Sequence, residues 1–262
     1  MIKALKSDPR YATSKNLDAR IALHRAYTPP GKDFWDFAWA HYDFLEVDRL
    51  LEVGCGSGAF WTHEAQRLSG SIDLVLSDKS RGMLDSARAN LVEAGIKAYY
   101  QVSEVEKLPF ESAAFDAVLA QFMLYHTSSQ GGALREIQRV LKKGGWAGIV
   151  LTQPGHMDEI FRVMRQLDPA SIPVFNSGRF TSEEGARLLQ SEFGDVQRHH
   201  YELQMRVTDA EMLARYAESS VGGLVTLPAS YWDDYLNVVG KVISSNGYFA
   251  VNKKCALFIC RG

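Results

Sequence analysis

An apolar run that breaks into three closely spaced glycines constrains this chain more than any other feature. The segment RLLEVGCGSGAF covers residues 49–60, and Gly54, Gly56 and Gly58 alternate with single residues in it. Glycine lets a chain turn sharply from a buried strand into a helix, and it lets a ligand approach the backbone closely. The segment therefore predicts a strand, a ligand-binding turn and a helix, in that order.

Apolar, β-branched runs alternate with amphipathic helical patterns on both sides of this turn. Such alternation over residues 49–152 is typical of a parallel sheet built from βαβ units. We predict an α/β fold with a Rossmann-like, seven-stranded, mainly parallel sheet and helices on both faces. The expected strands are 49–53, 72–77, 98–102, 115–121, 145–152, 196–207 and 254–261, and the expected helices between them are 58–69, 80–94 and 130–142.

The flanking regions have a less regular pattern. Residues 1–45 are expected to form an N-terminal helical lid, with a helix at 17–27 and, after the capping residue Asp33, an aromatic helix from residue 34. The main domain is expected to span residues 46–262. Helical patches interrupted by glycines and prolines predict cap insertions in this domain at about 153–194 and 208–249.

Composition limits the class of protein and its partners. Hydrophobic residues make up 46% of the 262 residues and the net charge is −2, values typical of a soluble globular chain with no basic surface for nucleic acid. No secretory signal and no apolar stretch of about 18 residues are visible, so we expect no membrane partner and a cytoplasmic location. The three cysteines are expected to be reduced, with no metal site. A monomer or a homodimer is expected.

The glycine turn alone admits two ligands. Gly54, Gly56 and Ala59 fit the G-x-G-x-x-G/A pattern of NAD-binding oxidoreductases, whereas the three glycines also fit a G-x-G-x-G pattern. Asp78 is expected at the end of the next strand, where a carboxylate can accept hydrogen bonds from the ribose hydroxyls of either cofactor. Glu52 ends a buried strand and needs a cation or hydrogen-bond donors, which a ligand ammonium or the N-terminal arm would supply.

Four motifs in order carry a family resemblance: LLEVGCGSG, LSDKSRGMLDSAR, SEVEKLPFESAAFDAVLAQFMLYH and ALREIQRVLKKGGWAGIV. Residues 49–152 resemble class I S-adenosylmethionine-dependent methyltransferases, in the branch of ubiquinone- and menaquinone-biosynthesis enzymes. The resemblance implies methyl transfer to an O, N or C atom of a small, apolar or aromatic metabolite in secondary metabolism or cofactor biosynthesis, with S-adenosylhomocysteine as the product. An NAD oxidoreductase, a non-transferring cyclase that keeps its S-adenosylmethionine, and an RNA methyltransferase remain the alternatives.

The resemblance also implies a set of cofactor contacts. Asp78 is expected to hold the ribose hydroxyls, and Glu104 and Val105 the adenine. The family usually has aspartate at Glu104, and asparagine or serine at Gln121, so these two contacts differ in this chain. Independently of the resemblance, Arg20 and His24 lie four residues apart on one face of the predicted lid helix and are expected to close over the cofactor, with Tyr11 nearby; solvated helix charge is the alternative. The complete expected set is Glu52, Gly54, Cys55, Gly56, Gly58, Asp78, Lys79, Met83, Glu104, Val105, Gln121, Tyr11 and Arg20.

Methyl transfer requires alignment of donor and acceptor, and an O or C acceptor also needs a general base. His126 and His156 follow carboxyl ends of predicted strands and are the candidate bases, although His126 also fits a supporting role in its loop. Aromatic residues are expected to wall the substrate cavity, with a purely core role as the alternative for each. These are Trp35, Trp39, Phe122, Tyr125, Phe175, Tyr231 and Trp232.

Overall fold

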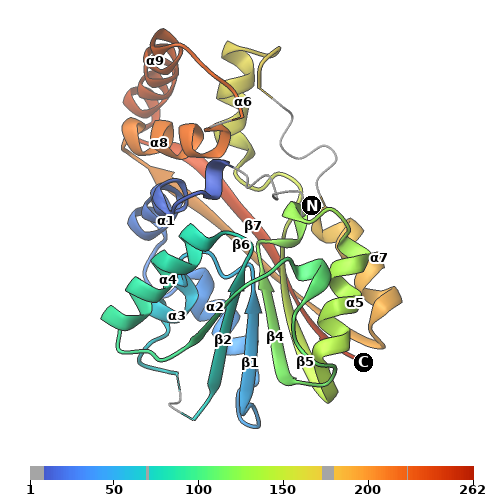
Figure 1. Ribbon diagram of the computed structural model, residues 1–262. Helices are drawn as coiled ribbons and strands as arrows, with labels where there is room; N and C mark the ends of the chain where they lie inside the picture. Colours follow the sequence, from blue (N-terminus) through green and yellow to red (C-terminus); the bar gives the residue numbers. More distant parts are fainter. Residues whose placement is uncertain (1–8, 69–70, 173–179, 223) are drawn as a thin grey trace, which may run out of the picture.

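A computed structural model describes residues 9–68, 71–172, 180–222 and 224–262 and shows a seven-stranded sheet (Figure 1). The strand order is β3-β2-β1-β4-β5-β7-β6; β7 pairs antiparallel with both neighbours, and the other pairs are parallel. This confirms the predicted α/β fold class. The strands are β1 (Arg49–Val53), β2 (Asp73–Asp78), β3 (Tyr99–Val102), β4 (Phe115–Gln121), β5 (Leu141–Thr152), β6 (Asp195–Val207) and β7 (Phe249–Arg261).

Nine α-helices and three short 3-10 helices surround the sheet in the described part of the chain. The α-helices are α1 (Lys15–Tyr27), α2 (Phe34–His41), α3 (Ala59–His63), α4 (Arg81–Glu93), α5 (Gln130–Val140), α6 (Asp158–Leu167), α7 (Ser182–Glu192), α8 (Ala210–Val221) and α9 (Ala229–Asn246). The 3-10 helices are η1 (Pro9–Tyr11), η2 (Val105–Lys107) and η3 (Leu124–His126). No described helix is long and apolar enough to cross a bilayer.

Each face of the sheet has its own apolar core. On one face α2, α3 and α4 contribute the buried side chains Phe34, Trp61 and Leu91. On the other face α5 contributes Leu134 and α7 contributes Leu189, and Phe193, directly after α7, packs in the same core. Removal of these apolar side chains from water is the main term that holds the helices to the sheet. Helix α7 therefore covers the sheet, although it falls inside the predicted cap insertion 153–194.

A third core lies beyond one end of the sheet, where α1, α6, α8 and α9 gather around the extended ends of β6 and β7 (Figure 1). Leu23 of α1, Met164 of α6 and Tyr235 of α9 are fully buried in it. Within the predicted lid, α1 packs against α8 in this cap, whereas α2 packs against the sheet. Helix α1 thus packs in the same layer as α8 and α9, which come more than 180 residues later in the chain.

Two predicted elements differ in length from the observed ones. The helix predicted at 58–69 ends at His63, because the chain turns there and the N–H groups of Arg67 and Leu68 both donate to the Glu64 carbonyl. The last strand begins at Phe249 rather than at residue 254, because it pairs with β6 from Val207↔Phe249 onward. Its polar stretch at residues 252–254 hid this extension in the sequence.

The contact between α2 and the sheet is tight at Gly148 of β5. A Cβ atom at this position would lie 2.5 Å from Tyr42 Cε1 and 2.8 Å from Leu119 Cδ2. We expect Gly148→Ala to lower the free energy of unfolding by about 1–3 kcal/mol, because overpacking displaces one of these buried side chains. Urea denaturation measures the change. Gly240→Ala in α9 is the control, since no heavy atom lies within 4 Å of its added Cβ; equal effects in the two variants would contradict the prediction.

Candidate active site

The loop between β1 and α3 contains three glycines in left-handed backbone conformations. Gly54, Gly56 and Gly58 have φ angles of +64°, +55° and +72°. A Cβ at Gly54 would also lie 2.7 Å from Met123 Cβ, and one at Gly58 would lie 2.5 Å from Leu91 Cδ1. Side chains are therefore excluded both by the backbone conformation and by the neighbours. The loop lies at the carboxyl edge of the sheet next to β4, where the strand order reverses and ligands of open α/β sheets bind.

Asp78 ends β2, as predicted, and joins two loops. Its Oδ2 accepts from the Gly56 N–H at 3.0 Å, and its Oδ1 accepts from the Ser80 N–H at 2.8 Å. Burial raises the pKa of Asp78, while these two hydrogen bonds lower it. Each carboxylate oxygen can accept more than one hydrogen bond. Asp78 can thus receive ligand hydroxyls while it holds the glycine loop.

Glu52 is a buried carboxylate, 3% exposed, at the end of β1. Its two oxygens accept from Trp61 Nε1 at 2.6 Å and from Gln121 Nε2 at 3.1 Å, and Gln121 Oε1 accepts from the Tyr42 hydroxyl at 3.1 Å. Burial raises the pKa of Glu52 to about 7, against the lowering effect of the two donors. Neutral donors, Trp61 and Gln121, thus meet the expected need of Glu52 for a cation or hydrogen-bond donors, and they come from α3 and β4 rather than from the N-terminal arm.

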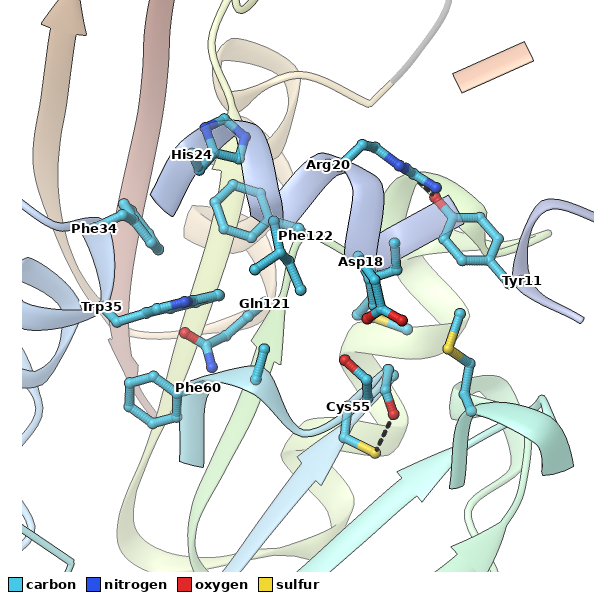
Figure 2. Close-up of a pocket in the computed structure, with 18 of the residues that line it drawn as sticks. Tyr11, Asp18, Arg20, His24, Phe34, Trp35, Cys55, Phe60, Gln121 and Phe122 are labelled. Carbon is cyan, nitrogen blue, oxygen red and sulfur yellow. Dashed lines mark hydrogen bonds between the residues drawn. The ribbon is translucent and has the colours of Figure 1, made fainter. Parts of the chain in front are cut away.

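The N-terminal segment crosses the carboxyl edge of the sheet. The Tyr11 hydroxyl lies 3.0 Å from His126 Nε2 and accepts from Arg20 Nη1 at 3.0 Å, and the Tyr11 carbonyl accepts from Ser80 Oγ at 2.7 Å. Figure 2 shows Tyr11 and Arg20 together on one side of the pocket, above the loop that carries Cys55. The segment thereby connects α1 with the loops that follow β2 and β4.

These groups line one large cavity of about 1390 Å³. A pocket for one small ligand usually measures roughly 300–1,000 Å³, so this cavity has room for two molecules. One compartment is bounded by the glycine loop and Asp78. The other is aromatic, and Figure 2 shows several of its walls at the opposite side from Tyr11. The aromatic walls are Phe34, Trp35, Phe60, Phe122, Phe161 and Tyr216.

Most residues predicted for the cofactor site lie around this cavity. Twelve of the thirteen line it: Tyr11, Arg20, Glu52, Gly54, Cys55, Gly56, Asp78, Lys79, Met83, Glu104, Val105 and Gln121. Gly58 does not line it, because its position makes the turn into α3. Both candidate bases, His126 and His156, are lining residues.

Only some of the aromatic residues predicted to wall the substrate cavity line it. Trp35, Phe122 and Tyr125 line the cavity. Trp39, Tyr231 and Trp232 do not, because the Trp39 ring packs 4.6 Å from Phe44 and the other two lie in the cap core, where the Tyr231 hydroxyl donates to the Met164 carbonyl at 2.8 Å. Phe175 falls outside the described residues.

The hydrogen bonding of His156 opposes the predicted role as a base. Its Nδ1 accepts from the Lys254 N–H at 3.0 Å, so Nε2 carries the proton of the neutral ring. Burial, with a smaller contribution from the Lys253 charge, lowers the pKa of His156 to about 3. At neutral pH the side chain is therefore a hydrogen-bond donor at Nε2.

Lys253 of β7 is among the lining residues that lay outside the predicted set, and His24 of α1, considered with Arg20 for the lid, also lines the cavity. The adjacent lysines 253 and 254 were the signal for the first, because neighbouring strand residues point to opposite faces. The expected strand began at residue 254, so this alternation was missed. His24 lies one helical turn from Arg20, on the same side of α1.

An acidic group beside α2 could be mistaken for a metal site. Ligand atoms of Asp36, His63 and Glu64 lie within 4.8 Å of one another. Arg67 already neutralises this group, with Nη2 at 2.7 Å from Asp36 and Nη1 at 3.0 Å from Glu64. The arrangement is accounted for by ion pairs within the protein.

The Glu52 environment predicts an unusual dependence of stability on pH. The folded pKa of about 7 exceeds the ordinary value of 4.5, so the folded state holds a proton that the unfolded state releases between these values. The unfolding free energy should therefore fall as pH rises from 4.5 to about 7, by about 3 kcal/mol. Glu52→Gln removes this contribution, because the amide does not titrate.

Urea denaturation of wild type and Glu52→Gln at pH 5 and at pH 8 measures this contribution. We expect the variant to gain stability relative to wild type at pH 8. The exposed Glu111→Gln serves as the control and should follow the wild type at both pH values. If Glu52→Gln and wild type lose stability in parallel, the buried carboxylate does not have the raised pKa.

Comparisons with known proteins agree with this geometry. Residues 51–149 match the family described as methyltransferase domain. The chain is 32% identical over 124 residues to a biotin biosynthesis bifunctional protein of Cellvibrio japonicus, and 34% identical over 112 residues to a ubiquinone/menaquinone biosynthesis C-methyltransferase of Chromobacterium violaceum. The matches cover 47% and 41% of this chain, and 24% and 46% of those proteins, so the chain spans at most about half of these relatives.

A solved structure shares the fold over most of the chain. A putative methyltransferase from Bacillus halodurans superposes with a TM-score of 0.56 at 16% identity, covering 87% of this chain and 98% of that one. The order of motifs, the seven-stranded sheet and the matched residues point to the same assignment. Residues 51–149 thus form a methyltransferase domain of the class I, S-adenosylmethionine-dependent type, and this part of the chain is similar to the ubiquinone/menaquinone C-methyltransferases.

Proposed function

We propose that this protein transfers a methyl group from S-adenosylmethionine to a small apolar or aromatic metabolite. The observation that carries the proposal is one continuous cavity that joins the glycine loop and Asp78 to an aromatic compartment. Its volume of about 1390 Å³ suits a cofactor together with a small acceptor. When bound, S-adenosylmethionine supplies the methyl group as an electrophile.

The residues of the first compartment fit this cofactor. Gly54 and Gly56 line the cavity with their backbone, so a ligand can approach the loop there. Asp78 is placed to accept the ribose hydroxyls, and Glu52 offers a buried carboxylate below the loop. Negative charge in this compartment suits a ligand that carries both a sulfonium and an ammonium group. Glu104 and Val105 at η2 are assigned to the adenine.

The residues of the second compartment suit an acceptor of low polarity. Its aromatic walls exclude water and hold the acceptor in line with the methyl group. The relatives are named for the biosynthesis of ubiquinone, menaquinone and biotin, and these small-molecule pathways support a small-molecule acceptor. We assign His126 to the closure of the site through Tyr11 and assign His156 to hydrogen bonding from Nε2.

Two measurements test the function. Isothermal titration should show binding of S-adenosylhomocysteine and none of NADH, which separates the proposal from an oxidoreductase. The protein is then incubated with methyl-labelled S-adenosylmethionine and a fractionated small-molecule extract, and mass spectrometry should find one labelled metabolite and an equal amount of S-adenosylhomocysteine. A rearranged metabolite with unconsumed cofactor would instead identify a cyclase, and label in RNA would identify an RNA methyltransferase.

The assignment of Asp78 predicts a specific loss of cofactor affinity. Asp78→Ala should weaken S-adenosylhomocysteine binding by about 1–3 kcal/mol, because the ribose hydroxyls lose their acceptor. Isothermal titration of the folded variant measures this. Asp85→Ala, an exposed position on α4, is the control and should bind as wild type does. Unchanged affinity in Asp78→Ala would remove Asp78 from the ribose site.

The assignment of the N-terminal segment as a lid predicts an effect on dissociation. A Cβ at Gly82 would overlap the carbonyl oxygen of Ala12, so Gly82→Ala should displace the segment from the start of α4. We expect bound S-adenosylhomocysteine to dissociate at least about fivefold faster, measured by stopped-flow displacement. Gly240→Ala again provides the control. An unaltered dissociation rate in Gly82→Ala would show that the segment does not retain the cofactor.

A further inference from the structure

Lys253 is a buried lysine in the aromatic compartment. It is 6% exposed and lines the cavity from β7. Its ammonium lies 5.1 Å from the centre of the Phe34 ring and 5.4 Å from the centre of the Tyr201 ring. Removal of an ammonium from water is costly, and two aromatic faces offset only part of that cost. A methionine or leucine would fill the same space without the penalty, so the charge at this place requires another explanation.

The ammonium of Lys253 lacks an oxygen acceptor. Among the described residues it forms no hydrogen bond and has no carboxylate oxygen within 4.0 Å. Asp33 acts on it through its charge, but that carboxylate caps α2 by accepting from the Trp35 N–H at 2.7 Å and lies 3.7 Å from His63 Nε2. Inside the described protein the lysine therefore has aromatic neighbours and no ion-pair partner.

The histidines near Lys253 add polar ring nitrogens to the same compartment. Burial is the main cause that lowers the pKa of both His24 and His156, and the charge of Lys253 lowers both further. His156 carries its proton on Nε2, which has no hydrogen-bond partner among the described residues. His24 Nδ1 is likewise buried without a partner in that part of the chain. Two neutral imidazoles and one ammonium thus meet in an aromatic pocket.

We propose that Lys253 binds an ionised oxygen of the methyl acceptor, so that the substrate is an aromatic acid: a ring that carries a carboxylate, a phenolate or an enolate. This inference rests on the proposed function and names the substrate class of that site. The anion supplies the acceptor that the ammonium lacks, and His156 Nε2 is a second donor beside it. The aromatic walls bind the ring, and the charge selects acids over neutral rings of the same shape.

A matched pair of probes tests the selection. The carboxylate 2-naphthoate and the neutral amide 2-naphthamide share one ring system and nearly one shape. Isothermal titration into protein saturated with S-adenosylhomocysteine should show that wild type binds the carboxylate at least about tenfold more tightly. Lys253→Met should abolish this preference by weakening the carboxylate alone, whereas Lys253→Arg should keep a preference for the acid.

The control is Arg206→Met, which removes a cation from the neighbouring strand β6. Arg206 lies 4.7 Å above the Tyr248 ring and does not line the cavity, so its replacement should leave the preference unchanged. Thermal unfolding of each variant verifies the fold. S-adenosylhomocysteine is also titrated into wild type and each variant without a probe. Loss of cofactor binding, which would contradict the proposed function, is thereby separated from loss of acid binding. Equal affinities for the two probes, a preference that survives in Lys253→Met, or binding of neither probe would overturn the inference.

Discussion

A hydrogen bond between two loops is the constraint on which the rest of the site depends. The Gly56 N–H donates to Asp78 at 3.0 Å, and this bond fixes the turn after β1 against the end of β2. The bond requires a left-handed backbone at Gly56, and the turn continues into α3 only because Gly54 and Gly58 adopt similar conformations. The same two strand ends form the floor of the cavity. One carboxylate thus organises the backbone and remains available to a ligand.

The sequence was sufficient to predict the features that depend on neighbouring residues. The glycine turn, the end of β2 at Asp78 and the amphipathic helix α5 follow from local spacing, and the structure shows each of them. Contacts that form only through tertiary packing were harder to predict from the sequence. Lys253 reaches the cavity because β7 pairs with β6 along its polar start, and Trp39 faces Phe44 rather than the cavity because of how α2 rotates against the sheet.

Aromatic composition was the least discriminating signal. Trp35 and Trp39 are one helical turn apart, yet only the first lines the cavity. In the cap the Trp232 ring packs against two tyrosine rings. Its centre lies 5.2 Å from that of Tyr231 and 5.9 Å from that of Tyr235. Side chains of the same chemistry serve as core or as wall according to which helix face the cap covers. That choice depends on contacts between segments far apart in the chain, and no local pattern contains it.

Charged side chains lie in both parts of the cavity. Glu52 and Asp78 lie at the glycine loop together with Lys79, and Lys253 lies in the aromatic compartment. Lys79 acts through its charge on the Asp78 carboxylate. The hydrogen bonds that hold Glu52 come from Trp61 and Gln121, which are neutral.

The anchoring of the N-terminal segment has a consequence for synthesis of the protein. Arg10 donates through Nη1 to the carbonyl of Ser220, a residue 210 positions later, and α1 packs against α8. Until α8 has left the exit tunnel, α1 therefore lacks one of the surfaces against which it packs. The sheet from β1 to β5 can assemble during that interval, since its strands precede α8. The contact between α1 and α8 therefore forms only after the strands β1 to β5 have been synthesised.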